Sequence, residues 1–113
     1  MDSTALAFPK PTKQSARRRA RHKRKVSLIA DIRQAVMARD ESCRVCGEPD
    51  GLHMHEVVFR SAGRSLVDTF SLVNCLALCC HCHTLIHARC IWLSFEDSAV
   101  GCNGPVIVST VRP

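Results

Sequence analysis

The stretch NCLALCCHCHTLIH, residues 74–87, concentrates thiol and imidazole groups more than any other part of the chain. It begins with an asparagine and a short, mostly apolar run, and from residue 79 onward it contains Cys79, Cys80, Cys82, His83 and His87. Thiolates and imidazoles are the ligands that zinc prefers in proteins. Whether this stretch serves one metal ion or two depends on which partners the rest of the sequence offers.

The first partners are another pair of cysteines. Cys43-Arg-Val-Cys46 and Cys79-Cys80-His81-Cys82 share the spacing C-x-x-C. A gap of two residues lets a turn direct both thiolates at one ion, and two such turns complete a tetrahedral four-thiolate shell. The sequence therefore predicts a structural Zn²⁺ site made by Cys43, Cys46, Cys79 and Cys82, with zinc binding coupled to folding.

Four further cysteines lie outside this set. Cys80 is an alternative to Cys79 or Cys82 as a ligand, although its spacing fits the pattern less well. We expect Cys75, Cys90 and Cys102 to be buried as small apolar residues, which is the usual state of a free cysteine.

Size and cysteine usage agree with a metal-stabilised domain. A chain of 113 residues forms one small domain, and a small domain usually needs a disulfide or a metal to be stable. The opening residues MDSTALAFPK lack the apolar core of a signal peptide, and no run of about 20 apolar residues could span a membrane. We therefore expect a reducing, cytoplasmic setting without a membrane partner, where paired cysteines more often bind metal. A secreted disulfide framework is the alternative.

The excess of positive over negative charge lies in the N-terminus. Residues 1–25 carry nine basic side chains against one acidic, and the remaining 88 residues have a net charge of −2. We interpret residues 1–25 as a disordered basic tail that binds nucleic acid through phosphates. A solvated tail that only aids solubility is the alternative. The proposed contacts are Arg17, Arg18, Arg19, Arg21, Lys23, Arg24 and Lys25.

The remaining residues, 26–113, are predicted to form one α+β domain. Apolar residues at three- and four-residue steps predict a helix over 26–40 that packs on the core, and the basic segment can extend the same helix. Residues 52–59 favour a strand, 60–71 a loop, and 71–78 a strand or a helix. A helix is expected from Cys82, and two strands within 90–111.

A second group of polar side chains surrounds the predicted zinc site. His83 and His87 are four residues apart, so they share one face of the predicted helix. His53 and His55 share one face of the predicted strand, with Glu56 on the other. Ordinary hydrogen-bonded histidines are the simpler interpretation of any two of these residues. Together they indicate a second site, for a divalent ion.

These residues resemble a known family, the HNH endonucleases. The order His55-Glu56, Asn74, Cys79-x-x-Cys82-His83-x-x-x-His87 is similar to the short type found in phages and bacteria that carries a four-cysteine zinc. The resemblance covers residues 43–88. It implies a small zinc-stabilised ββα-metal (His-Me finger) fold of two strands and a helix that grips one catalytic divalent ion.

The resemblance also implies roles for single residues. His55, His83 and His87 match the positions of the ligands of the catalytic ion, and Asn74 matches the central asparagine that holds the loop and orients the base. Arg60 falls in an Arg-Ser segment that meets a phosphate, and Arg64 would add a second phosphate contact. The ion is Mg²⁺, Mn²⁺, Ni²⁺ or Zn²⁺.

The chain departs from the family at the general base. Glu56 stands where a second histidine is usual, and a solvated carboxylate is a weaker base than imidazole. Either Glu56 takes the proton from water, or His55 does so and leaves the ion to His83 and His87. The expected function is a metal-dependent endonuclease that hydrolyses DNA phosphodiester bonds, with few means of reading base sequence. The alternative is a zinc-finger nucleic-acid-binding protein of the same fold with little or no activity.

Overall fold

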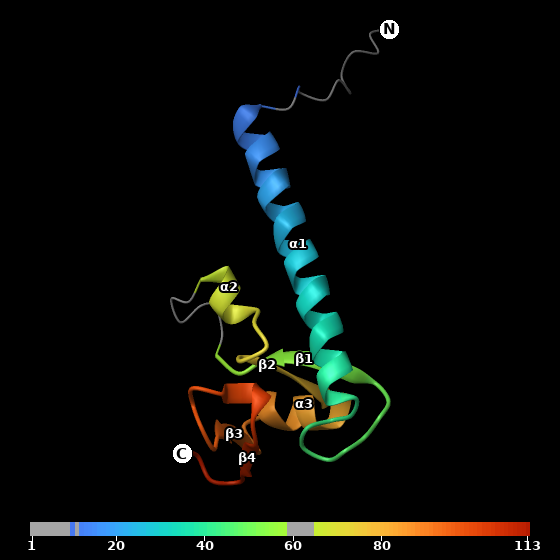
Figure 1. Ribbon diagram of the computed structural model, residues 1–113, viewed down its shortest axis with the longest axis vertical. Helices are drawn as coiled ribbons and strands as arrows, with labels where there is room; N and C mark the ends of the chain where they lie inside the picture. The colour runs from blue at the N-terminus through green and yellow to red at the C-terminus, as the bar shows by residue number, and fades with distance from the viewer. Residues whose placement is uncertain (1–9, 11, 59–64) are drawn as a thin grey trace, which may run out of the picture.

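The protein is a small α+β structure from which one long helix projects (Figure 1). The computed structural model describes residues 10, 12–58 and 65–113. The elements in order are α1 (Lys13–Asp40), β1 (Leu52–Glu56), α2 (Leu66–Thr69), β2 (Cys75–Cys79), α3 (Cys80–His87), β3 (Trp92–Phe95), the 3₁₀ turn η3 (Gly101–Asn103) and β4 (Val106–Ser109). Strand β1 pairs with β2 and β3 with β4, both antiparallel. The prediction of an α+β fold is confirmed.

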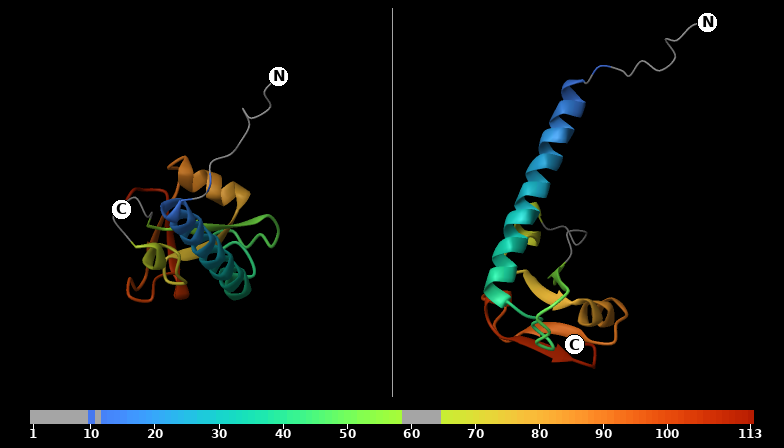
Figure 2. Two further views of the ribbon diagram at one scale, coloured as in Figure 1. Left: turned by 90° about the horizontal axis from the view of Figure 1, so that it is seen from above. Right: turned by 90° about the vertical axis from the view of Figure 1, so that its right-hand side faces the viewer.

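Helix α1 begins much earlier than the apolar pattern indicated. We interpreted residues 1–25 as a disordered tail and noted that the basic segment can extend the helix; residues 13–25 do form the first part of one 28-residue helix, which confirms the extension, and residues 1–9 and 11 lie outside the described residues. Thr12 caps this helix in a capping box with Ser15, and the arginines, lysines and alanines that follow favour helix. The basic half of α1 stands away from the body of the molecule, whose longest dimension is 66 Å (Figures 1 and 2).

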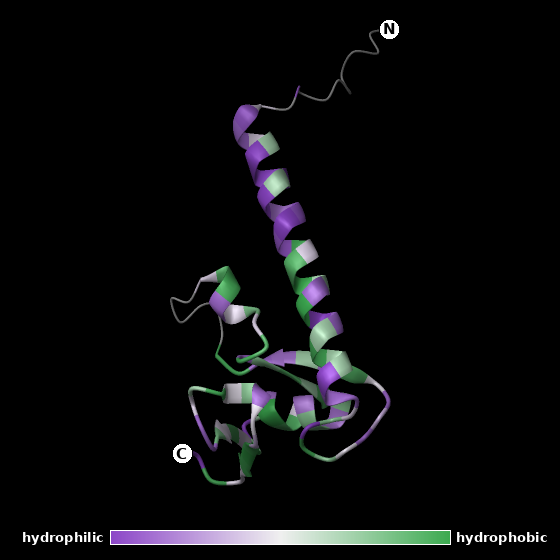
Figure 3. Ribbon diagram, viewed as in Figure 1, coloured by the Kyte–Doolittle hydropathy of each residue, from purple (hydrophilic) through white to green (hydrophobic). Residues whose placement is uncertain are grey.

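The two halves of α1 have different surroundings. Figure 3 shows the N-terminal half as almost wholly hydrophilic, and every residue from Ala16 to Arg24 is exposed. We expected the apolar face to pack on the core from Val26 onward, but Val26 is 52% exposed. Packing begins at Ile32 and continues through the buried Val36 and Met37, because only the last turns of the helix reach the sheet.

Strand β2 is the centre of the fold, and all five of its residues are buried. Leu76 and Leu78 face the core that contains the cysteines of the predicted zinc site. Cys75 and Ala77 face the opposite way and pack beneath α1 with Val36. A strand covered on both faces reads as a continuous apolar run, which is why its pattern did not distinguish strand from helix.

The pairing of β1 with β2 sets the direction of every side chain on β1. Met54 lies opposite Ala77 and packs with the α1 cluster, whereas His55 lies opposite Leu76 and faces the other side. The strand ends at Glu56, three residues before the predicted end. Residues 66–69, predicted as loop, form the short helix α2, and α3 begins at Cys80, two residues earlier than expected.

The other cysteines divide by burial. Cys75 and Cys102 are fully buried, as predicted, and burial raises the pKa of each thiol to about 11. The prediction is wrong for Cys90, which is exposed just after the end of α3. Among the described residues, no helix has an apolar stretch long enough to cross a membrane.

A buried carboxylate joins α1 to the rest of the fold. The Asp40 side chain is 1% exposed and accepts hydrogen bonds from Arg39 (2.7 Å), Arg44 (2.9 Å) and the backbone N–H of Ala77 (2.9 Å). Arg39 also donates to the carbonyls of Leu72 and Cys75, and Arg44 to those of Cys102 and Gly104. One cluster of charges therefore ties the end of α1 to β2 and to the segment before β4.

The ionised form of Asp40 is the stabilising one. Burial alone would raise the pKa of its carboxyl, but the hydrogen bonds from Arg39 and from the backbone of Ala77 hold the pKa below its ordinary value. The resulting stabilisation is present at neutral pH and is lost only as the pH falls through this lowered pKa.

We predict that Asp40→Asn lowers the free energy of unfolding by about 2–4 kcal/mol at pH 7, because it leaves two partly buried guanidinium groups without their carboxylate. Urea denaturation of the zinc-loaded protein measures the change. Asp31→Asn, an exposed change on the same helix, is the matched control and should shift stability by less than about 0.5 kcal/mol. Equal effects of the two changes would contradict this role for Asp40.

Candidate metal centres and the basic helix

The four predicted zinc ligands come together at one end of the β1–β2 pair. Cys43 and Cys46 flank a tight turn closed by the N–H of Gly47, which donates to the carbonyl of Cys43 (2.9 Å). Gly47 has a φ of 82°, a conformation that favours glycine. Cys79 ends β2, and Cys82 lies in the first turn of α3. The four Sγ atoms all lie within 4.8 Å of one another, so the set can hold a metal ion.

The distances and charges of this cluster fit a zinc ion. The sulfurs of Cys46 and Cys79 are 3.5 Å apart, close to the roughly 3.8 Å between two thiolates on one tetrahedral zinc. Burial alone would raise the pKa of Cys43, but hydrogen bonds from the backbone of Cys46, Cys79 and Val45 lower it to about 6. Burial and the neighbouring sulfurs raise the pKa of Cys82. Four thiolates at this spacing repel one another, and a divalent cation removes that cost.

Three histidines form a second cluster next to the first. His83 and His87 lie on one face of α3, and His55 lies on the face of β1 that is opposite Leu76. One ring nitrogen from each lies within 4.8 Å of the other two. The Nε2 atoms of His83 and His87 are 2.9 Å apart, near the roughly 3.3 Å between two imidazole nitrogens on one tetrahedral zinc. The donor set therefore fits one divalent ion.

The electrostatics of this cluster keep imidazole in the form that binds metal. Burial lowers the pKa of His55 to about 4, assisted by the nearby His83 and His87. Burial, together with His87 and His53, also lowers the pKa of His83, while Glu56 opposes this shift. His55 and His83 are accordingly neutral at pH 7, and a neutral imidazole nitrogen can coordinate a metal without first losing a proton.

Asn74 holds the loop between the two strands. It is 3% exposed and lies immediately before β2, at a loop-to-strand junction. Its Nδ2 donates to the carbonyls of Val58 (2.9 Å) and Thr69 (2.8 Å), and its Oδ1 accepts from the N–H of Val58 (3.0 Å). The amide thus connects the end of β1 to α2.

Two further side chains on β1 border the histidine cluster. Glu56 lies opposite Cys75, so the alternation of the strand places it on the α1 side, away from His55. Its charge still reaches His83, whose pKa it raises. His53 shares the face of His55, and its ring centre is 5.8 Å from that of His83. We had noted His53 by its spacing but had given it no place among the site residues.

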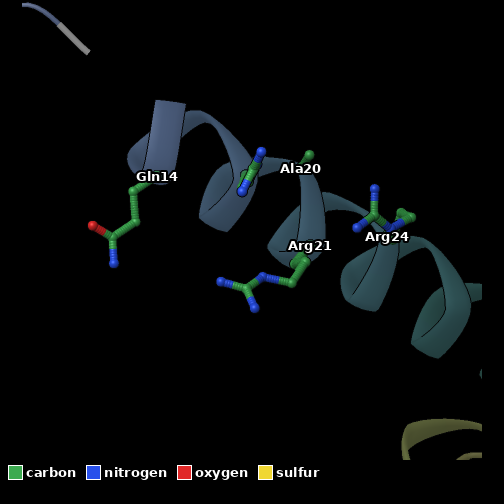
Figure 4. Close-up of a pocket in the computed structure, with 5 residues that line it drawn as sticks. Gln14, Ala20, Arg21 and Arg24 are labelled. Carbon is green, nitrogen blue, oxygen red and sulfur yellow. The ribbon is translucent and has the colours of Figure 1, made fainter. Parts of the chain in front are cut away.

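The basic residues of α1 line two hollows. Arg17, Arg21 and Arg24 recur at helical spacing on one face and border the first hollow with Gln14 and Ala20 (Figure 4). Arg21 and Arg24, with His22 and Lys25, border the second, whose far side is Leu66 of α2. The predicted contacts Arg18, Arg19 and Lys23 border neither hollow. Arg60 and Arg64, also predicted to meet phosphates, lie outside the described residues.

Comparisons with family models, with curated proteins and with solved structures found no match to this chain. The assignment of a function therefore depends on the residues and the geometry described above.

The zinc assignment predicts three classes of thiol reactivity. In the native zinc-loaded protein, the exposed Cys80 and Cys90 should react rapidly with iodoacetamide. Cys43, Cys46, Cys79 and Cys82 should react only after a chelator removes the ion, and the buried Cys75 and Cys102 only after unfolding. Peptide mass spectrometry of the alkylated protein measures the order. Rapid labelling of Cys46, which is exposed, in the presence of zinc would contradict the four-thiolate site.

Proposed function

We propose that this protein is a metal-dependent endonuclease of the HNH type that hydrolyses DNA phosphodiester bonds. The observation that carries the proposal is the histidine cluster. His55 is far from His83 and His87 in sequence, yet ring nitrogens of the three residues lie within 4.8 Å of one another. The histidines lie on β1 and α3, and the order β1, β2, α3 is the one that the resemblance to HNH endonucleases implies.

In this proposal the four cysteines hold a structural zinc. The four cysteines connect the turn at 43–46 to the start of α3. Among the described residues, the core that contains Cys43, Cys79 and Cys82 has one aromatic side chain packed against it, the partly buried Phe95. A core of this size gains much of its stability from a bound ion. Zinc thereby fixes the position of α3, which carries two of the three histidines.

The histidine cluster would hold the catalytic divalent ion. When bound, that ion supplies Lewis acidity toward the scissile phosphate and the leaving oxygen. His55, His83 and His87 present ring nitrogens from two rigid elements, and Asn74 fixes the loop that enters β2. The basic half of α1 holds the nucleic-acid backbone by its phosphates.

The proton acceptor for the attacking water is the least conventional part of the site. Glu56 occupies the position of the usual histidine, and its carboxylate acts electrostatically on His83. We propose Glu56 as the base, because His55 already belongs to the set of three nitrogens. The weaker basicity of a carboxylate than of imidazole implies slow cleavage.

A second candidate function is a nucleic-acid-binding protein of the same architecture with little or no hydrolytic activity. The observation that favours it is again Glu56, which the register of β1 and β2 places opposite Cys75, on the other face from His55. A carboxylate directed away from the cluster would leave the water without a base.

We predict that the wild-type protein nicks supercoiled plasmid in the presence of Mg²⁺, Mn²⁺ or Ni²⁺, and that His83→Ala abolishes nicking because it removes one nitrogen of the cluster. Agarose gels that resolve supercoiled from nicked plasmid measure the rate. His81→Ala, an exposed histidine on the same helix outside the cluster, is the matched control and should retain the wild-type rate.

The same assay separates the two candidate functions. If Glu56 is the base, Glu56→Ala lowers the rate by about 10²-fold or more, and Glu56→His retains or raises it. No cleavage by wild type with any of the three ions, or cleavage unaffected by His83→Ala, would eliminate the nuclease. Activity gained only in Glu56→His would favour the binding protein.

The hollows along α1 predict that one face of the helix carries the phosphate contacts. Replacing Arg17 and Arg21 with glutamine should weaken duplex DNA binding and lower the slope of log K against log salt by about 2, since each phosphate contact contributes about 0.9. Replacing Arg19 and Lys23 removes the same charge from the opposite face and keeps the i,i+4 spacing. Fluorescence anisotropy at several salt concentrations measures both slopes. Equal slopes for the two variants would contradict a preferred face.

A further inference from the structure

We propose that the cavity beside the histidine cluster binds an unpaired nucleobase, which stacks on Trp92 while Arg89 contacts its phosphate. This inference rests on the proposed function and specifies its substrate class: nucleic acid with single-stranded or unpaired nucleotides, rather than a continuous duplex.

The cavity has a volume of about 300 Å³, and two of its lining residues, His55 and His87, belong to the histidine cluster. Apolar side chains of Val57, Ile86, Ile91 and Leu93 also line it. This volume is at the lower end of the range for pockets that bind small molecules, so it suits one base and its sugar but not a base pair. An apolar pocket next to metal ligands has no evident purpose in a site that handles only phosphates.

Trp92 gives the cavity an aromatic surface. It is the sole tryptophan of the chain and is half-buried at the start of β3, where pairing with Ser109 of β4 fixes its backbone. Stacking on an aromatic side chain is the common way in which proteins hold unpaired bases, because every base offers a π face regardless of sequence.

Arg89 supplies a positive charge at the same cavity, in an unusual backbone conformation. The N–H groups of Arg89 and Cys90 donate to the carbonyls of Ile86 and Leu85, a pattern that closes the end of a helix. In this pattern the residue just past the helix end has a left-handed backbone and is most often glycine. Arg89 occupies this position with a φ of 58°. Arginine is more strained than glycine in this backbone conformation, so we infer that the Arg89 side chain makes a functional contact.

The placement determines which nucleotide is held. His55 and His87 belong both to the cavity wall and to the proposed ion site, so a base in the cavity lies directly beside the phosphate to be cleaved. A base within a duplex cannot enter without leaving its stack, which costs free energy that an unpaired base does not pay.

The test uses the intrinsic fluorescence of Trp92 in the wild-type, zinc-loaded protein without added divalent ion. Three probes are titrated in parallel: a 12-nucleotide single-stranded DNA, an abasic strand of the same length, and the blunt duplex of the first strand with its complement. We expect the single strand to quench the fluorescence, and the abasic strand and duplex to bind through α1 with little quenching. Equal responses to all three probes would overturn the inference.

Variants at both residues separate recognition from folding. Trp92→Leu should weaken binding of the single strand about tenfold and Trp92→Phe less than about threefold, with duplex binding unchanged, as measured by anisotropy. Arg89→Gly retains the helix end in a residue better suited to it, so the variant should melt at or above the wild-type temperature while binding the single strand less tightly. Unchanged single-strand affinity in both Trp92→Leu and Arg89→Gly would contradict the base pocket.

This experiment and the nicking assay fail independently. Plasmid nicking that depends on His83, without quenching by single strands, would eliminate the pocket and leave the nuclease. Quenching specific for unpaired bases, without nicking by any ion, would establish the pocket in a nucleic-acid-binding protein and eliminate the nuclease.

Discussion

The antiparallel pairing of β1 with β2 is the constraint on which both clusters depend. The register opposes Leu52 to Cys79, and this brings the cysteine turn at 43–46 next to the cysteines at the start of α3. The same register opposes His55 to Leu76 and directs its imidazole to the side where His83 and His87 lie. Because side chains alternate along a strand, a slip of one residue would turn His55 toward α1 and dismantle the histidine cluster. One ladder of hydrogen bonds thus determines the geometry of two sites.

The remainder of the fold holds β2 in place from both faces. On one face α1 packs through Val36, and the carboxylate of Asp40 reaches the backbone N–H of Ala77. On the other face, the leucines of β2 pack with Cys43, Cys79, Cys82 and Cys102. Arg39 and Arg44, which both bind Asp40, also donate hydrogen bonds to residues 102–104. These bonds connect the segment before β4 to the end of α1. The elements that carry the histidines, β1 and α3, both contact β2, whose five residues are all buried, and precise ligand geometry requires such rigid support.

Predictions from sequence succeeded where a short spacing carries the physical reason. The two C-x-x-C pairs and the i,i+4 pair of histidines are local patterns, and the structure brings each set together. Predictions failed where the outcome depended on distant partners. Val26 is exposed because only the last turns of α1 reach the sheet, and Cys90 is exposed in the segment after α3. The role of Asp40 was invisible, because a carboxylate at the end of a helix does not reveal that Arg44 and the N–H of Ala77 will enclose it.

The sequence by itself determined the inventory of this protein: two pairs of thiols, a set of imidazoles, a basic segment of helix-forming residues and an apolar strand to connect them. Only the tertiary structure decided which of these residues come together. It brought His55 to His83, 28 residues later in the sequence, placed Glu56 on the opposite face, and formed a cavity lined by two of the histidines and Trp92. Local spacing fixes which side chains can act as a pair, but only the register of a ladder and the packing of its two faces fix which pairs meet.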